Sequence, residues 1–310
     1  MEKFLITGVM GFVGSHLAEL LLKSGKTVYG IDLEPSAPHL LDYDNFLFTH
    51  DTIKNTDILR NMVDRVDVVC HLAGVAEPDQ YIKYPRKVID ITGIVGVNLV
   101  DLCRQSGKLF FFTSTSEIYG KSRFVPFRED GDRILGSITT RRWCYSTSKA
   151  MVEHYLFACA AEKELNFVTV RLFNIFGPRL SGRVVSNFVD CARNGGTLRV
   201  HGDGSQTRAF TYIDDAVEAF RRLLDDSSCY NEVFNVGSSK ETSIGELAEI
   251  VRDVCNPSCR IEFQSHKDYY GLSYEDIPRR VPDVSKIRSY IGWESSTSLE
   301  DGIRKMYLEK

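Results

Sequence analysis

Strand-like and helix-like segments alternate along the first half of the chain, and this alternation limits the fold more than any other feature. The apolar runs are KFLIT, TVYGID, NFLF, VDVVCHLA, LFFFTS and FVTVRLF. The main helical patterns cover residues 12–23, 85–106 and 143–163. Strands of this composition that alternate with helices are typical of a parallel sheet with helices on both faces. We therefore expect an α/β fold with a doubly wound parallel sheet.

The alternation weakens after GPRL at residues 177–180, where shorter elements and polar turns such as HGDGSQ follow. This change predicts a first domain over residues 1–175 and a smaller C-terminal lobe over residues 176–310, interleaved with the first. Ligands of doubly wound sheets bind at the carboxyl ends of the strands. The smaller lobe is therefore expected to close over a substrate.

The composition excludes several classes of function. The 310 residues carry a net charge of −4 and no run rich in Lys or Arg, which argues against nucleic-acid binding. No segment approaches the roughly 18 consecutive apolar residues of a membrane span, and the start MEKFLITG lacks a signal-peptide core. We expect a cytoplasmic protein. The eight cysteines do not show a metal-ligand spacing, so no metal site is predicted.

A glycine-rich loop, TGVMGFVG, lies between the first strand and the first helix, and its glycines are Gly8, Gly11 and Gly14. Such a loop allows a tight turn and brings the amides of a helix N-terminus to a pyrophosphate. Asp32 ends the second strand 18 residues after Gly14, close to the ~20 at which an acid binds the adenosine ribose. Because a carboxylate there repels a 2′-phosphate, we predict NAD in preference to NADP.

Tyr145 and Lys149 lie four residues apart in YSTSK, near the start of a predicted helix. This spacing places both side chains on one helix face. A free tyrosine has a pKa near ~10, and a neighbouring cation lowers it toward the range of a general base. The preceding strand ends in the hydroxyls and carboxylate of TSTSE, residues 113–117.

Together, the glycine loop, Asp32, YSTSK and TSTSE resemble the extended short-chain dehydrogenase/reductase superfamily, and within it the NAD-dependent nucleotide-sugar epimerase/dehydratase family. The resemblance implies a Rossmann-type sheet and an NAD cofactor. It also implies that Tyr145 takes a proton from a sugar hydroxyl while NAD accepts hydride from the same carbon. The implied cofactor-binding residues are Gly8, Gly11, Phe12, Val13, Gly14, Asp32, Asp51, Thr52, Leu72, Tyr145 and Lys149.

Two further motifs resemble the UDP-glucuronic acid decarboxylases of this family. Dehydratases typically carry Asp-Glu where this chain has Ser116 and Glu117, and epimerases usually lack the Glu. The segment YYGLSYEDIPRRVPD, residues 269–283, is similar to one in the bacterial aminoarabinose-pathway decarboxylase and in UDP-apiose/xylose synthases. The implied catalytic residues are Thr115, Glu117, Tyr145, Lys149 and Arg280. The implied substrate-binding residues are Ser116, Asn174, Arg183, Arg199, Arg208 and Tyr274.

Several alternatives stay open at this point. Glu117 can also be read as a capping or loop carboxylate, and Arg280 as the partner of Asp283 or Asp276. The short PRLSGR loop leaves open whether the uronic acid carries a hydroxyl or an N-acetyl group at C2, and the 4-keto product can be released or reduced to a UDP-pentose. A UDP-sugar 4-epimerase, a 4,6-dehydratase and a non-catalytic nucleotide-sensing regulator are the competing functions. By family analogy, helices near residues 88–104 and 152–164 are expected to form a homodimer.

Overall fold

The chain folds into two compact units, each built from several stretches of sequence. The computed structural model describes residues 2–264 and 277–309. Unit 1 comprises Met1–Ile118, Leu135–Arg171 and Phe220–Phe234, and unit 2 comprises Tyr119–Ile134, Leu172–Ala219 and Asn235–Lys310. In the part of the chain that the structure describes, no helix combines the length and apolar character needed to cross a bilayer.

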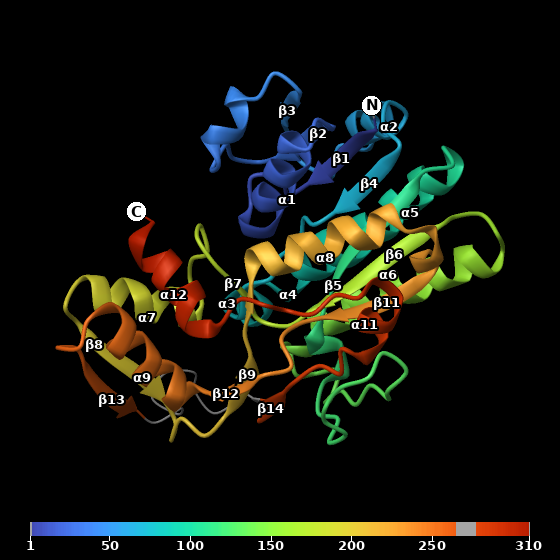
Figure 1. The fold of residues 1–310 in the computed structure, drawn as a ribbon. Helices are drawn as coiled ribbons and strands as arrows, with labels where there is room; N and C mark the ends of the chain where they lie inside the picture. Colours follow the sequence, from blue (N-terminus) through green and yellow to red (C-terminus); the bar gives the residue numbers. More distant parts are fainter. Residues whose placement is uncertain (1, 265–276, 310) are drawn as a thin grey trace. The chain divides into compact units, whose positions relative to one another are not determined.

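Unit 1 is built around a seven-stranded sheet with the strand order β11-β6-β5-β4-β1-β2-β3 (Figure 1). The pairings of β1 with β2 and β4, of β2 with β3 and of β4 with β5 are parallel, which confirms the expected doubly wound parallel sheet. The strands are β1 (Lys3–Thr7), β2 (Thr27–Asp32), β3 (Phe46–His50), β4 (Val68–His71), β5 (Leu109–Thr115), β6 (Phe167–Leu172) and β11 (Glu232–Val236).

The central strand β5 is buried on both faces of the sheet, to which its alternate side chains point. On β5, Phe110 and Phe112 join an apolar cluster with residues of α2 (Thr56–Val63), α5 (Val95–Gln105) and α6 (Trp143–Ala161). Phe111, between them, packs on the other side against Phe220 of α8 (Ile213–Asp225), with ring centroids 5.2 Å apart. The continuous apolar run of β5 therefore reflects burial on both faces.

The helical segment predicted over residues 85–106 contains a change of helix type. It runs as α4 (Pro85–Val88), a π-helical segment η2 (Ile89–Ile94) and α5. This segment packs closely against α6: a Cβ on Gly96 would lie 2.7 Å from Val152 Cγ2, and one on Gly93 2.8 Å from Met151 Cε. The remaining helices in unit 1 include α1 (Phe12–Lys23) and α3 (Pro78–Lys83).

Unit 2 contains smaller sheets and several helices. Its sheets pair β10 with β7, β12 with β9 and β14, and β13 with β8. These strands are β7 (Ile175–Phe176), β8 (Thr197–His201), β9 (Thr207–Ala209), β10 (Thr211–Tyr212), β12 (Glu241–Ser243), β13 (Arg260–Gln264) and β14 (Arg279–Arg280). Its helices include α7 (Val184–Arg193), α9 (Ile244–Cys255), α11 (Ser285–Ile291) and α12 (Leu299–Leu308).

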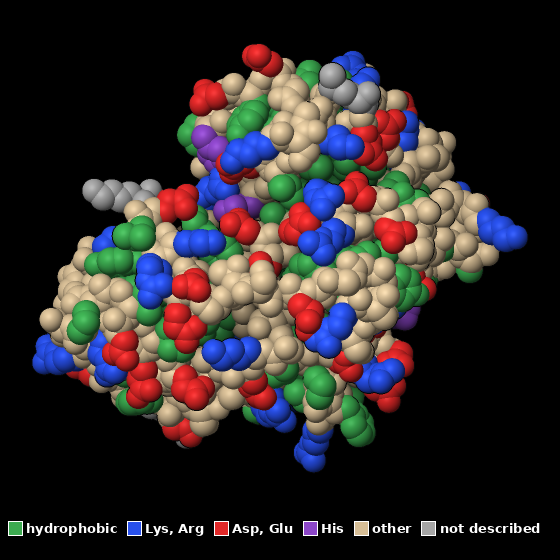
Figure 2. All heavy atoms as spheres, viewed as in Figure 1, with side chains coloured by type: hydrophobic (Ala, Val, Ile, Leu, Met, Phe, Trp, Pro, Cys, Tyr) green, Lys and Arg blue, Asp and Glu red, His purple; other side chains and the backbone are tan. Residues whose placement is uncertain are grey.

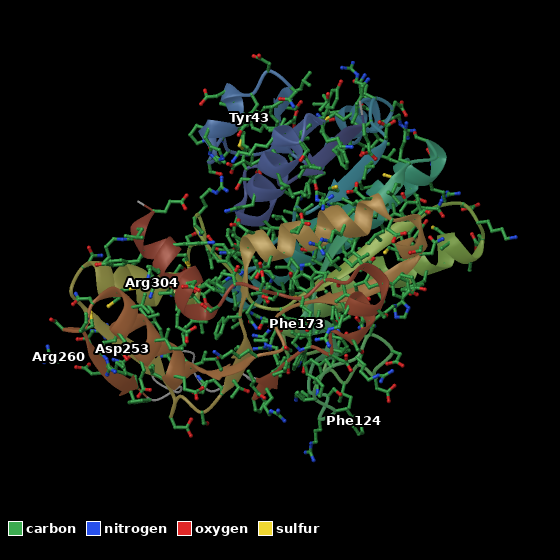
Figure 3. All side chains as sticks on the ribbon, viewed as in Figure 1. Tyr43, Phe124, Phe173, Asp253, Arg260 and Arg304 are labelled. Carbon is green, nitrogen blue, oxygen red and sulfur yellow. The ribbon has the colours of Figure 1, made fainter. Side chains whose placement is uncertain are left out.

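An aromatic cluster lies inside unit 2. Tyr119 and Phe127 stack with ring centroids 4.7 Å apart, and Phe173 packs against both rings. Phe173 is fully buried, whereas Phe124 is 77% exposed, and Figure 3 shows Phe124 in a loop at the edge of the view. Acidic and basic side chains are interspersed over the face shown in Figure 2.

Candidate active site

The glycine loop forms the tight turn that the sequence predicts. Gly8 has a φ of +71°, and a Cβ at this position would lie 2.9 Å from the backbone of Ala73. A Cβ on Gly14 would lie 2.0 Å from the carbonyl oxygen of Gly8. Gly8 requires glycine because of its left-handed backbone and the lack of space, and Gly14 because of the lack of space alone. Helix α1 starts directly after Gly11, so the loop leads into a helix N-terminus.

The residues around this loop fit the adenosine and pyrophosphate portions of NAD. The first turn of α1 has no acidic residue and its start no side-chain cap, within the described chain, which suits an anionic pyrophosphate. Asp32 Oδ2 accepts a hydrogen bond from the amide of Met10 at 2.9 Å, and Oδ1 accepts one from Leu33 at 2.8 Å. These contacts hold the carboxylate against the loop.

The other predicted cofactor residues lie near the same edge of the sheet. Phe12 and Val13 begin α1. Asp51 follows β3, and its amide donates to the carbonyl oxygen of Asp32 at 3.1 Å; the amide of Thr52 donates to Asp51 Oδ1 at 2.6 Å. Leu72 follows β4. The carboxyl ends of β1, β2, β3 and β4 thus bring the predicted residues together within unit 1.

Tyr145 and Lys149 are both buried, four residues apart on α6. Lys149 Nζ donates a hydrogen bond to the carbonyl oxygen of Thr113 at 2.6 Å and lies 4.6 Å from the centroid of the Phe112 ring. Burial lowers the pKa of Lys149 to about 7, although the negative charge of Glu153 acts to raise it. The Tyr145 ring stacks on Tyr81 of α3, with centroids 4.7 Å apart and planes at 8°.

Gly74 and Thr92, which the sequence analysis did not identify, line the space beside Lys149. A Cβ on Gly74 would lie 3.6 Å from Lys149 Nζ and 3.6 Å from Thr92 Oγ1. Thr92 belongs to the π-helical segment, is fully buried, and accepts a hydrogen bond from the amide of Val75 at 3.3 Å. No motif in the sequence analysis pointed to Gly74 or Thr92, because their proximity depends on how the chain packs.

The TSTSE segment ends β5 and begins the short helix η3 (Ser116–Tyr119). Thr115 Oγ1 accepts a hydrogen bond from the amide of Glu117 at 3.2 Å, and Ser116 is 2% exposed. The Glu117 carboxylate accepts a hydrogen bond from Arg142, with Nη2 and Oε2 3.0 Å apart. Sequence reasoning missed Arg142 as a partner of Glu117; Arg142 belongs to the motif RRW, residues 141–143, shortly before Tyr145.

Two of the predicted substrate-lobe residues lie on neighbouring strands of unit 2, and a third, Asn174, precedes β7. Arg280 on β14 is in register with Arg208 on β9. Arg208 Nη1 donates to the carbonyl oxygen of Thr207 at 2.8 Å. Asn174 Nδ2 donates to the carbonyl oxygen of Ala209 at 2.9 Å, and Asn174 has a φ of +39°. A left-handed backbone at a residue other than glycine is often found at functional sites.

The remaining predicted residues of unit 2 lie on other elements. Arg183 precedes α7, and its amide donates to Ser186 Oγ at 3.1 Å. Arg199 is exposed on β8, in register with Glu262 of β13. Tyr274 lies outside the described residues, as do Asp276 and most of the 269–283 motif. Within the described ranges, His, Cys, Asp and Glu side chains do not form a group of three that could hold a metal.

A family model described as the NAD dependent epimerase/dehydratase family matches residues 4–237. The chain belongs to this family. As a member of the NAD-dependent epimerase/dehydratase family it uses NAD, in agreement with the glycine loop and Asp32.

Similar proteins within the family are named either decarboxylases or 4-epimerases. The chain is 34% identical to the UDP-N-acetyl-alpha-D-glucosaminuronate decarboxylase of Bacillus cytotoxicus, over 98% of this chain and 96% of that protein. It is 32% identical to UDP-glucuronic acid decarboxylase 1 of Danio rerio, over 98% and 71%. The crystal structure of UDP-glucuronic acid 4-epimerase from Bacillus cereus with UDP-glucuronic acid and NAD has a TM-score of 0.88 and 27% identity, over 98% of each chain.

Proposed function

We propose that the chain is an NAD-dependent decarboxylase of a UDP-uronic acid. The observation that carries the proposal is the Ser116-Glu117 pair at the carboxyl end of β5, in the same unit as Tyr145 and Lys149. In the resembling dehydratases an Asp precedes the Glu, and in epimerases the Glu is usually missing. The decarboxylase names of the Bacillus cytotoxicus and Danio rerio relatives support the same reading.

The first step is oxidation of the sugar at C4. When bound, NAD accepts hydride from C4 while the C4 hydroxyl gives its proton to the phenolate of Tyr145. Lys149, buried and four residues further along the same helix face, favours that phenolate when protonated and binds the nicotinamide ribose. Thr115 holds the C4 oxygen. The stacked ring of Tyr81 fixes the plane of the Tyr145 phenol.

The second step is loss of carbon dioxide from the β-keto acid. The C5–C6 bond breaks, its electron pair moves into the C4 carbonyl, and C5 then takes up a proton. Glu117 acts at the carboxylate end of the sugar, and Arg280 recognises the carboxylate. Because tight binding of the substrate carboxylate would stabilise the ground state more than the transition state, we assign Arg280 to positioning.

The arginines of unit 2 suit the diphosphate of a UDP-sugar. Guanidinium groups donate to phosphate oxygens in bidentate fashion. We assign Arg183, Arg199 and Arg208 to this end, together with Asn174 and Ser116 at the sugar. The uronic acid is UDP-glucuronate or its C2 N-acetyl analogue, since relatives named for each substrate match nearly the whole chain. The product is a 4-keto sugar nucleotide or, after re-reduction, a UDP-pentose such as UDP-xylose.

UDP-sugar 4-epimerisation is the second candidate, because solved epimerases share the fold over nearly the whole chain. An epimerase oxidises C4 in the same way but keeps C6. Incubation with UDP-glucuronate, UDP-N-acetylglucosaminuronate and UDP-glucose, followed by mass spectrometry, separates the two. We expect one uronate to lose carbon dioxide and UDP-glucose to remain unchanged. An unchanged mass with both uronates would contradict the proposal.

We further propose that the enzyme works in the cytoplasm as a homodimer. All eight cysteines are free, as expected of a reducing compartment. Four large apolar side chains at α4–α6 are between 41% and 48% exposed, namely Ile89, Ile94, Met151 and Phe157. Exposed apolar side chains of this size suit burial against a second copy of the chain.

A further inference from the structure

Glu117 and Arg142 form an ion pair that is largely shielded from water. Their side chains are 15% and 7% exposed, and Oε2 and Nη2 lie 3.0 Å apart. Exposed ion pairs contribute little to stability. When a buried pair loses one partner, the other is left as an uncompensated buried charge, which is costly. This pair is therefore expected to control the charge and the orientation of the Glu117 carboxyl group.

Arg142 is fixed independently of Glu117. It is the residue that precedes α6, and its Cζ lies 5.3 Å from the centroid of the Trp143 ring, a residue only 3% exposed. Arg142 also lies three residues before Tyr145, which is one helical turn. The Arg142 guanidinium thus links the start of α6, the helix of Tyr145 and Lys149, to the Glu117 carboxylate after β5.

A guanidinium within hydrogen-bond distance favours the charged form of a carboxyl group. The contact with Arg142 therefore favours Glu117 as a carboxylate that accepts hydrogen bonds. The backbone of Glu117 is held as well, because its amide donates to Thr115 Oγ1 at 3.2 Å. Both the charge and the position of Glu117 are therefore set before substrate binds.

We propose that Arg142 is a positioning residue for the decarboxylation step and that it holds Glu117 as an oriented carboxylate. The inference rests on the proposed function. Glu117 then acts as an anion that orients water near C5 and C6. As the C5–C6 bond breaks and its electrons enter the C4 carbonyl, the proton that C5 gains comes from water and not from the carboxyl group of Glu117.

A double-mutant cycle tests this role, with Glu117→Gln, Arg142→Gln and the combined variant. Each is mixed with the uronate that the wild type decarboxylates, and two rates are followed: NADH absorbance for C4 oxidation and released carbon dioxide. We expect Arg142→Gln to slow carbon dioxide release about 10- to 100-fold, as misplacement of a catalytic group does. NADH formation should change by less than about threefold, since Tyr145 and Lys149 are intact.

The decisive comparison uses the Glu117→Gln variant as background. There, adding Arg142→Gln should cause no further loss in the rate of carbon dioxide release. Arg142→Lys should recover part of the rate, because it restores the charge without the planar donor group. The matched control is Arg141→Gln, an exposed arginine whose Nη1 donates to the carbonyl oxygen of Ile82 at 3.1 Å; it should behave like the wild type. If Arg142→Gln does not fold, Arg142→Lys alone and with Glu117→Gln completes the same cycle.

Equal losses from the arginine substitution in both backgrounds would overturn the inference, as would an equal loss in NADH formation. These outcomes differ from failure of the proposed function. In that case the wild type itself would release no carbon dioxide from either uronate.

Discussion

The buried face of α6 and the residue just before the helix carry polar and charged side chains that a protein core normally excludes. Arg142, Tyr145, Lys149 and Glu153 follow one another at spacings of three and four residues. Arg142 pairs with Glu117, Lys149 donates to Thr113, and Glu153 forms an ion pair with Arg171 at 2.7 Å. Local rules of burial are broken in this way mainly at functional sites.

The sequence predicted the tyrosine and lysine of this row because their spacing is local. It could not predict Arg142 with Glu117 or Glu153 with Arg171, whose partners are separated by 25 and 18 residues. Such pairs depend on how a helix packs on the sheet. Arg142 was visible only as part of a motif, without a role.

Replacement of Lys149 by Met should stabilise the protein without ligand at pH 7, by up to about 4 kcal/mol. Burial lowers the pKa of Lys149 from 10.5 to about 7. Between these values the unfolded chain binds a proton that the folded chain does not, so wild-type stability rises with pH across this window. The advantage of Lys149→Met should therefore be full at pH 7 and shrink toward pH 10. Chemical denaturation at several pH values measures it, and a difference independent of pH would contradict the burial of an uncharged lysine.

At the level of elements, the strands and the first helix were predictable because their patterns are local and regular. The helical region over residues 85–106 was not fully predictable, since it contains the π-helical segment Ile89–Ile94. A one-residue change in helix period is set by packing against α6 and leaves little trace in hydrophobic periodicity. Its effect is to place Thr92 beside Gly74 and Lys149.

Close packing of α5 on α6 should make Gly96 intolerant of larger residues. A Cβ there would lie 2.7 Å from Val152 Cγ2, so Gly96→Val should cost about 1–3 kcal/mol through overpacking. Adding Val152→Ala should restore part of this loss. Gly245→Val on α9 is the matched control, because the nearest atoms to its Cβ lie at 3.6 and 3.8 Å. Equal destabilisation at both glycines, measured by urea unfolding, would show that the interface with α6 is not the cause.

For the whole molecule, the sequence predicted the family, and the family model and relatives confirm it. It could not predict how chain segments are shared between compact units, because Tyr119–Ile134 and Phe220–Phe234 each join the unit opposite to their neighbours in sequence. Long-range contacts decide such exchanges. Tyr274 and its motif lie outside the described residues, so its role stays a prediction.

The proposed homodimer should depend on the apolar side chains exposed on α4–α6. The double variant Ile94→Lys and Met151→Lys places charges on residues that are 48% and 41% exposed. We expect light scattering to show the mass of two 35.1-kDa chains for the wild type and of one chain for the variant. Leu308→Lys, at a residue 73% exposed on α12, should remain dimeric. A variant that stays dimeric would rule out this surface.

The proposed decarboxylase differs from an epimerase in that C6 leaves the sugar after Tyr145-dependent oxidation at C4. The most direct measurement uses UDP-uronates labelled with ¹³C at C6 and follows labelled carbon dioxide. We expect the wild type to release the label from one of the two uronates in proportion to substrate consumed, and Tyr145→Phe to release none. Conversion of labelled substrate to a product that retains the label at C6 would contradict it and favour the 4-epimerase.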